Sequence, residues 1–430
     1  MHFELFFLGL WDAMEEYVRH INVNSLDSCF YNAVLAVHQG RYAAAEKYLE
    51  EARDVIDTEL TAMAAESYSR AYDTMVIVQM LSEVEETMHY KMMPEKRPLI
   101  CQMWWKRLQE CQRTVEDWQK FLQVRSLVLS PDDMRRMWLK FASLCRKNGK
   151  MALSHGTLVL LLHYDPNKSE EFTLPLHKPD LTYAYCKHLY CEGRKDLAIS
   201  QLNLLIESTC KLGLPKHSHE QMQKDLMRLK AKCFLRLGHW TEMNCPENEP
   251  PLPQVMLYYR KATEFDKDMY KAWHALACTN FNAVLYYKQK SAHQKSAATG
   301  VEAPDDSSKY SPRCSLQNEN LITVYAVQAV RCFFRSVALC SGNSLQETLR
   351  LLTLWFDYGQ NPEVYDALME GIATVKIETW LQVITQLIAR IDTTRHLVNR
   401  LITQLLTDIG KEHPHVSELN FSYLLLAGCF

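Results

Sequence analysis

A pattern of small and large residues recurs along the chain and limits its fold more than any other feature. In the first copy, the run Phe30 to Ala36 leads through Gly40 to the small residues Ala44 and Ala45. Later copies begin at Trp138, Tyr183, Ala231 and Lys271. Each copy predicts two helices that touch through their small residues. Because a single helix pair cannot bury its own apolar stripe, the pairs must stack, and the pattern predicts an α-solenoid.

We therefore expect an all-α protein with tetratricopeptide-like helical repeats over residues 1–287 and HEAT-like helical repeats over residues 321–414. Residues 288–320 are rich in Ser, Ala, Lys, Asp and Pro and poor in large apolar residues, which predicts a disordered insertion. Residues 415–430 are expected to form a divergent C-terminal tail. The turn inside a helix pair is expected at a glycine in four copies, namely Gly40, Gly149, Gly193 and Gly238.

Glycine is scarce, which argues against enzymes that hold phosphates in glycine-rich loops. Only 13 of 430 residues are glycine, against an average usage of about 7%. Neither a Gly-x-Gly-x-x-Gly run nor a P-loop is present. The tripeptide Asp357-Tyr358-Gly359 superficially resembles the metal-binding motif of protein kinases, but the other kinase motifs do not precede it. We expect a helix that ends at this glycine, and no catalytic residues.

Cysteine and histidine spacings do not predict a metal site. The 14 cysteines include no Cys-x-x-Cys pair, which favours buried free thiols in a reducing compartment. The pairs His217 with His219 and His413 with His415 lack further ligands at metal spacing, so they are interpreted as solvated loop residues. Six tryptophans at helical spacing are expected in the core, namely Trp104, Trp105, Trp118, Trp138, Trp240 and Trp273.

The overall charge is nearly balanced, whereas the local charge is not. The formal net charge of −3 gives no global field that favours direct binding to nucleic acid or a membrane. Residues 46–90 carry three basic and eleven acidic side chains, whereas residues 91–150 carry fourteen basic and six acidic ones. No apolar run approaches 18 residues, so no transmembrane segment is expected. The first residues, Met1 to Trp11, lack the basic start and cleavage site of a signal peptide.

Seven basic residues belong to consecutive repeat units, and several occupy equivalent places in them. They are Arg113, Lys140, Lys147, Lys187, Lys232, Arg236 and Lys271. On a superhelix, equivalent positions of stacked repeats project onto one face and can converge on a basic pocket. A phosphate-rich polyanion suits such a pocket, because each Lys or Arg donates a charge-assisted hydrogen bond. The same spacing also fits a solvated basic face, and periodicity alone leaves both interpretations open.

Longer runs of the sequence carry a family resemblance. These runs are Trp11–Tyr17, Glu59–Tyr72, Gln112–Lys120, Val124–Val128, Tyr270–Ala275, Leu351–Gly359 and Thr379–Asp392. They resemble the FAT domain of target of rapamycin (TOR) kinases, which are phosphatidylinositol 3-kinase-related kinases. The resemblance extends over about residues 9–414 and is more specific than a general tetratricopeptide pattern.

The resemblance implies a C-shaped α-solenoid that clamps a kinase domain and holds inositol hexakisphosphate as a structural ligand. The family's pocket positions fall on the seven basic residues named above. Lys232 and Arg236 exchange Lys and Arg relative to the mammalian-type pattern, which keeps the charge but alters bidentate geometry. The implied partners are the TOR kinase domain and TOR-complex subunits. The implied location is the cytoplasm. Two further locations stay open, namely lysosomal or other endomembranes, reached through the TOR complex, and the nucleus.

The resemblance is to a part of the family's architecture. The family's FAT domain begins upstream of this sequence, and the residues after Pro414 depart from the family pattern before any rapamycin-binding or kinase domain. We therefore expect a truncated isoform, a partial gene model or a fragment that acts as a non-catalytic scaffold segment. Two alternatives remain open. In the first alternative, the chain is a free interaction protein that competes for TOR-complex partners. In the second, it is part of an active kinase whose catalytic domain is missing from this chain.

Overall fold

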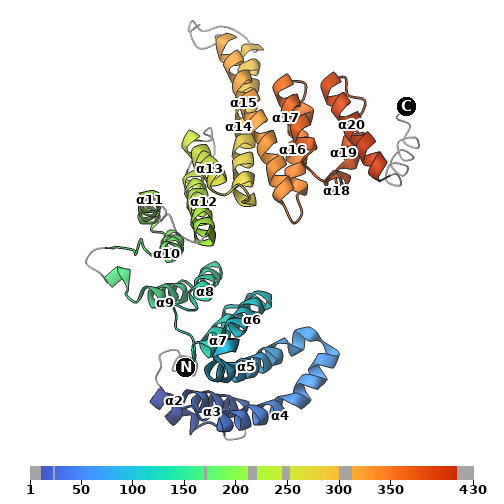
Figure 1. Cartoon of the computed structure of the whole chain (residues 1–430). Coiled ribbons are helices and arrows are strands. Elements are labelled where there is room, and N and C mark those ends of the chain that lie inside the picture. The colour runs from blue at the N-terminus through green and yellow to red at the C-terminus, as the bar shows by residue number, and fades with distance from the viewer. Residues whose placement is uncertain are drawn as a thin grey trace. The chain divides into compact units, whose positions relative to one another are not determined.

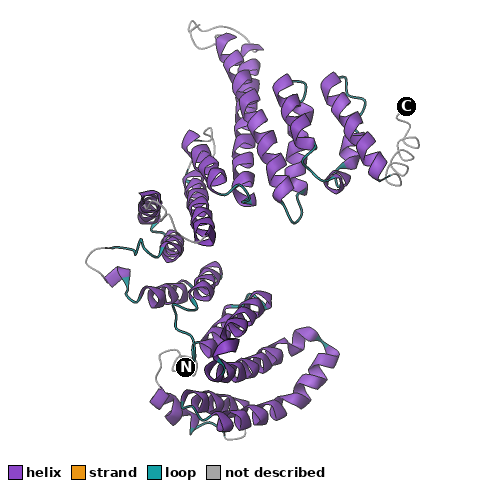
Figure 2. Ribbon diagram, in the orientation of Figure 1, coloured by secondary structure: helices purple, strands orange, loops and turns teal. Residues whose placement is uncertain are grey.

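The computed structural model describes residues 11–22, 25–168, 172–211, 220–244, 252–299 and 312–413, with the side chains of residues 59, 210–211, 294–299 and 312–317 excepted. Across these ranges the protein is built from helices and contains no strand (Figures 1 and 2). The prediction of an all-α fold is confirmed. The chain divides into two compact units, Met1–Gln201 and Leu202–Phe430, called here the first and second unit. The boundary falls inside helix α11, Lys195–Lys211.

Helices of the first unit pack mainly on their neighbours in the chain. They are α2 (Trp11–Val18), α3 (Leu26–His38), α4 (Tyr42–Glu66), α5 (Tyr68–Met92), α6 (Arg97–Glu110), α7 (Val115–Arg125), α8 (Arg135–Lys147), α9 (Met151–Leu162) and α10 (Pro179–Glu192), with short 3-10 turns at Pro94–Lys96 and Pro166–Lys168. Helix α3 contacts α4, α4 contacts α5, and α8 contacts α9. Packing between successive helices is the arrangement that helical repeats require.

Three of the four predicted glycine turns are present. Gly40, Gly149 and Gly193 follow α3, α8 and α10 with φ of 75°, 75° and 100°, a left-handed conformation that residues with a Cβ rarely adopt. The turn predicted at Gly238 is wrong, because this glycine lies inside α12, Glu220–Met243. A Cβ at Gly238 would lie 2.6 Å from the Cε1 atom of Tyr259, so the glycine permits a close helix contact.

A buried ion pair joins α5 to α7 in the first unit. The Nε and Nη2 atoms of Arg125 donate to the carboxylate of Glu83 at 2.8 and 2.6 Å. Both side chains are fully buried. The guanidinium also lies over the rings of Trp104 and Phe121, at 5.7 and 5.9 Å from their centroids. This bidentate, ring-flanked geometry satisfies charges that would be costly to bury alone.

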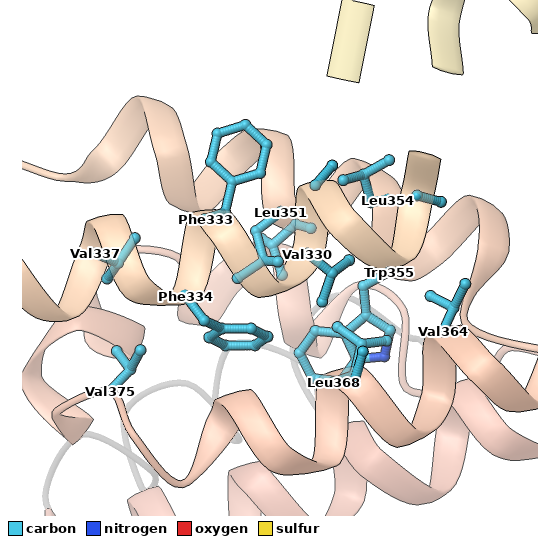
Figure 3. Close-up of a cluster of buried hydrophobic side chains, with 14 of the residues drawn as sticks. Val330, Phe333, Phe334, Val337, Leu351, Leu354, Trp355, Val364, Leu368 and Val375 are labelled. Carbon is cyan, nitrogen blue, oxygen red and sulfur yellow. The ribbon is translucent and has the colours of Figure 1, made fainter. Parts of the chain in front are cut away.

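The second unit is held together by an apolar core. Its helices are α12, α13 (Pro253–Phe265), α14 (Tyr270–Thr299), α15 (Pro312–Leu339), α16 (Leu345–Tyr358), α17 (Pro362–Ile372), α18 (Ile377–Leu381), α19 (Ile384–Ile388) and α20 (His396–Glu412). Helix α15 contacts α14, α16 and α17. Phe333, Phe334 and Trp355 are buried in the resulting cluster (Figure 3). The rings of Trp355 and Trp380 meet edge to face at 6.1 Å, a favoured aromatic geometry.

Two helices extend into the range in which the sequence predicts disorder. Helix α14 continues to Thr299 and α15 begins at Pro312. Residues 288–299 and 312–320 are therefore helical in the structure, where the sequence analysis expects disorder, and residues such as Gln289, Lys290 and Ala292 favour helix despite their low hydrophobicity. Residues 300–311 of the predicted insertion lie outside the described residues.

One apolar segment is longer than the sequence analysis allows. Residues Asn318–Leu339 of α15 are long and apolar enough to cross a membrane, with a mean hydropathy of 1.3. More than half of this segment, 56%, is buried inside the protein. Contacts with α14, α16 and α17 explain its composition as that of a core helix. The predicted tail 415–430 and the histidines His217, His219 and His415 lie outside the described residues.

Candidate functional site

Helix α8 presents cations on one face and packs its opposite face into the core. Arg136, Lys140 and Lys147 are exposed. At 3.6 residues per turn, these positions lie within about 40° of one another around the helix axis. The other face of α8 is buried through Met137, Trp138, Phe141, Ala142 and Cys145. Because the apolar stripe fixes the rotation of α8, the three cations point away from the core.

The indole of Trp105 on α6 lies against two of these cations. The Cζ atom of Arg136 lies 4.0 Å from the centre of the Trp105 ring. The Nζ atom of Lys140 lies 4.4 Å from the same centre. Both distances are within the range of cation–π attraction. The two contacts connect α6 to the basic face of α8.

This position of Trp105 corrects one prediction from the sequence. Trp105 is half-buried, as is Trp273, whereas the other four tryptophans are in the core as predicted, namely Trp104, Trp118, Trp138 and Trp240. The indole Nε1 of Trp273 donates to the carbonyl of Lys267 at 2.8 Å. Helical spacing alone did not distinguish a tryptophan that fills the core from one at its edge.

Arg113 adds a third positive charge near Lys140. It is exposed on the loop that joins α6 to α7. Burial lowers the pKa of Lys140, and the charges of Arg136 and Arg113 lower it further. The structure therefore places Arg136, which the sequence analysis missed, beside the predicted site residue Lys140, and the charge of Arg113, a second predicted site residue, acts on the same ammonium.

These cations differ from their neighbours in lacking acidic partners. Across the described ranges of the chain, none of the four, Arg113, Arg136, Lys140 and Lys147, forms an ion pair with a carboxylate. The adjacent Arg135 is paired with Asp132, at 2.9 Å between Nη2 and Oδ1. Lys150 is paired with Glu116. The uncompensated charge is concentrated on one side of α8.

Lys187 lies on α10, which contacts both α8 and α9. Its side chain is half-buried, and its Nζ atom lies 4.2 Å from the centre of the Tyr183 ring. The aromatic contact holds the alkyl stem against the protein. The first unit therefore contains four of the seven predicted positions, on α8, on α10 and on the loop before α7.

The other three predicted positions belong to the second unit. Lys232 and Arg236 lie four residues apart on α12, and Lys271 is the second residue of α14. Lys232 and Lys271 are exposed and Arg236 is half-buried. Burial and a hydrogen bond to Glu242 raise the pKa of Tyr259, and the nearby charge of Arg236 opposes this rise. A spacing of four residues places Lys232 and Arg236 on one face of α12.

The kinase-like tripeptide forms the end of a helix, as predicted. Helix α16 ends at Tyr358 and Gly359 follows it. The carboxylate of Asp357 accepts from the Nζ atom of Lys288 at 2.6 Å, so it is engaged in an ion pair. A Cβ at Gly359 would lie 2.4 Å from the carbonyl oxygen of Trp355, which explains the glycine. Its φ of −65° is open to any residue, so the glycine is required by the lack of space for a Cβ and not by its backbone conformation.

The residues that the structure describes contain no group of three or more His, Cys, Asp or Glu side chains suited to a metal ion. The cysteines of the same ranges are free thiols. Five are buried, and Cys191 is exposed. The expectation of burial therefore holds for only part of the set. Burial raises the pKa of the Cys145 and Cys186 thiols to about 12, which keeps these thiols protonated and unreactive.

Comparison with known proteins adds a family to this geometry. The family model described as the FAT domain matches residues 7–353. The serine/threonine-protein kinase mTor of Drosophila melanogaster is 48% identical over 406 residues, which cover 94% of this chain and 16% of that protein. The kinase tor1 of Schizosaccharomyces pombe is 37% identical over 426 residues, covering 95% and 17%. The kinase TOR of Arabidopsis thaliana is 34% identical over 463 residues, covering 98% and 17%.

A more distant relative marks the wider group. The serine/threonine-protein kinase ATR of Oryza sativa is 24% identical over 471 residues. The chain spans about a sixth of the length of the curated relatives it matches.

Proposed function

Because this chain belongs to the FAT domain family, with TOR-type kinases among its relatives, we propose that it is a non-catalytic helical scaffold that supports a TOR-type kinase domain and binds inositol hexakisphosphate. The observation that carries the proposal is the basic face of α8, where Arg136 and Lys140 share the Trp105 ring and, within the described residues, form no ion pair with a carboxylate. In this proposal the seven basic positions hold the ligand, and catalysis belongs to a kinase domain outside this sequence.

Electrostatics explain why a polyanion suits this face. Like charges gathered on a surface repel one another and destabilise the folded unit. Each phosphate group carries a charge of about −1.5 to −2 near neutral pH. Every charge-assisted hydrogen bond to Lys or Arg is worth about 1.5–3 kcal/mol. Inositol hexakisphosphate presents several phosphates on one ring, so a single molecule neutralises several cations at once.

The packing of the chain supports a scaffold role. Stacked helices expose long surfaces to partners while each helix stays fixed by its buried face. Asp357 forms an ion pair with Lys288 near the end of α16. The metal-binding aspartate of a kinase instead coordinates the magnesium ion beside the nucleotide phosphates. We propose TOR-complex subunits as the partners of these surfaces, and the cytoplasm as the place where they meet.

Isothermal calorimetry of the purified chain with inositol hexakisphosphate tests the ligand. We expect binding by the wild-type chain and its loss in the triple variant Lys140→Ala, Lys147→Ala and Lys232→Ala. Lys150→Ala is the matched control, because Lys150 is already paired with Glu116. A monomeric, helical wild-type chain that does not bind would overturn the assignment of the site.

Co-purification tests the scaffold role separately. The chain, carrying an affinity tag, is expressed together with the subunits of a TOR complex. We expect these subunits to be recovered with it, because solenoid surfaces bind partners over large areas. Recovery equal to that of an unrelated helical repeat protein would contradict the scaffold role and leave the ligand proposal standing.

A further inference from the structure

Trp105 and Arg136 lie next to the predicted site residue Lys140. The indole contacts both α8 cations, at 4.0 Å from the Cζ atom of Arg136 and 4.4 Å from the Nζ atom of Lys140. These two cations lie four residues apart, one turn along the same face. The sequence did not predict a contact between the indole and either cation, because Trp105 was expected in the core.

The arrangement is costly without a ligand. Like-charged residues four apart on a helix destabilise it, and the charge of Arg136 acts on the Lys140 ammonium. Arg113 adds a further repulsion from the neighbouring loop. A cation–π contact offsets only part of this cost at an exposed site. In the described part of the chain no carboxylate forms an ion pair with these three cations, so a bound anion would relieve a repulsion that solvent alone now screens.

We propose that Arg136 is a further phosphate-binding residue of this site and that Trp105 is its positioning residue. This inference rests on the proposed binding of inositol hexakisphosphate. A guanidinium presents its donors in a fixed plane that matches two phosphate oxygens. Because its Cζ atom is held 4.0 Å from the centre of the indole, Arg136 loses fewer conformations when it binds. Trp105 acts through the two cations and does not itself bind a phosphate.

The test is calorimetric titration of the full chain with inositol hexakisphosphate at two salt concentrations. We expect Arg136→Gln to weaken binding about tenfold, as the loss of one charge-assisted contact predicts. Its control is Arg135→Gln, which removes the same charge from the adjacent residue of α8 but breaks only the surface pair with Asp132. We expect this control to bind as tightly as the wild type. Arg136→Gln should also reduce the salt dependence of the dissociation constant, because one fewer cation contacts the ligand.

Trp105 is tested by a rescue series. Trp105→Leu removes the aromatic face and should weaken binding about threefold, whereas Trp105→Phe keeps a π face and should restore most of the affinity. The ligand should also change the fluorescence of the wild-type chain, and Trp105→Phe should remove that change. Circular dichroism confirms that each variant remains folded. A merely structural role for Trp105 would lower stability without separating Leu from Phe in affinity.

The outcomes separate the two proposals. If the wild type binds and Arg136→Gln binds as tightly as Arg135→Gln, the role of Arg136 is refuted while the site itself stands. If the wild type does not bind, both proposals fail. If Arg136→Gln alone weakens binding and Trp105→Phe rescues Trp105→Leu, both the binding and the positioning roles are supported.

Discussion

The two units of this chain bury different chemistry. In the first unit the ion pair of Glu83 and Arg125 is enclosed between α5 and α7. In the second unit the described core is aromatic and aliphatic, with Phe334 and Trp355 at its centre (Figure 3). Buried ion pairs are poor sources of stability, because desolvation offsets much of their attraction. The first unit is therefore the one that encloses a fully buried ion pair, and it also carries the unpaired cations of α8.

One glycine from each unit shows two different reasons for the absence of a side chain. Gly149 in the first unit has a left-handed φ and open space around it, so it serves a turn. Gly371 in the second unit has no room for a side chain, because a Cβ there would lie 2.0 Å from the Cδ2 atom of Phe334. The close approach of α15 and α17 therefore requires that residue 371 have no Cβ.

Breaking the buried ion pair should have the largest effect on stability. Arg125→Met leaves the Glu83 carboxylate buried without a partner and should cost about 3–5 kcal/mol of unfolding free energy. The double variant with Glu83→Leu removes both charges and should recover most of that loss. Urea unfolding followed by circular dichroism measures both. If the single and double variants are equally unstable, the cost lies in packing and the contrast between the units is lost.

Filling the close helix contact of the second unit should cost up to about 3 kcal/mol. Gly371→Ala places a Cβ against Phe334 and forces α15 and α17 apart. Its control is Gly156→Ala in the first unit, where the added Cβ meets nothing within 4 Å. The control should stabilise its helix by about 0.5–1 kcal/mol. Thermal unfolding of the two variants should move in opposite directions, and movement in the same direction would disprove the packing argument.

Acid should weaken the first unit through His188. The pKa of His188 is lowered to about 4, chiefly by burial; the charge of Glu192 opposes this shift, and the charges of His155 and Arg146 contribute to it. Its ring packs against His155 and Tyr185.

Because the unfolded chain takes up this proton near pH 6.5 and the folded chain only near pH 4, stability falls as pH falls between these values. The loss from this one group should be about 2 kcal/mol at pH 5. Unfolding free energies at pH 7 and pH 5 measure it, and His188→Gln should reduce the difference between the two. An unchanged difference in the variant would assign the pH dependence to other groups.

The sequence was sufficient for features that depend on local spacing. It predicted the all-α class, the turns at Gly40, Gly149 and Gly193, and the helix end at Gly359. These features follow from periodicity and from the backbone freedom of glycine within a few residues.

Features that depend on a distant partner could not be predicted. Gly238 has the spacing of a turn glycine, and only its contact with Tyr259 on another helix shows why glycine is needed there. Trp105 has the spacing of a core residue, but its cation partners are on α8. The pairing of Glu83 with Arg125 spans 42 residues. A single sequence carries no signal that joins such positions.

The most direct measurement is hydrogen exchange of the full chain with and without inositol hexakisphosphate, resolved helix by helix. A ligand that binds only the folded state slows the opening of the elements it contacts. The account predicts slower exchange in α8, α10 and the loop that carries Arg113, in α12 and at the start of α14, with α16 to α20 unchanged. Exchange that is unchanged everywhere, or slowed only in α16 to α20, would contradict it.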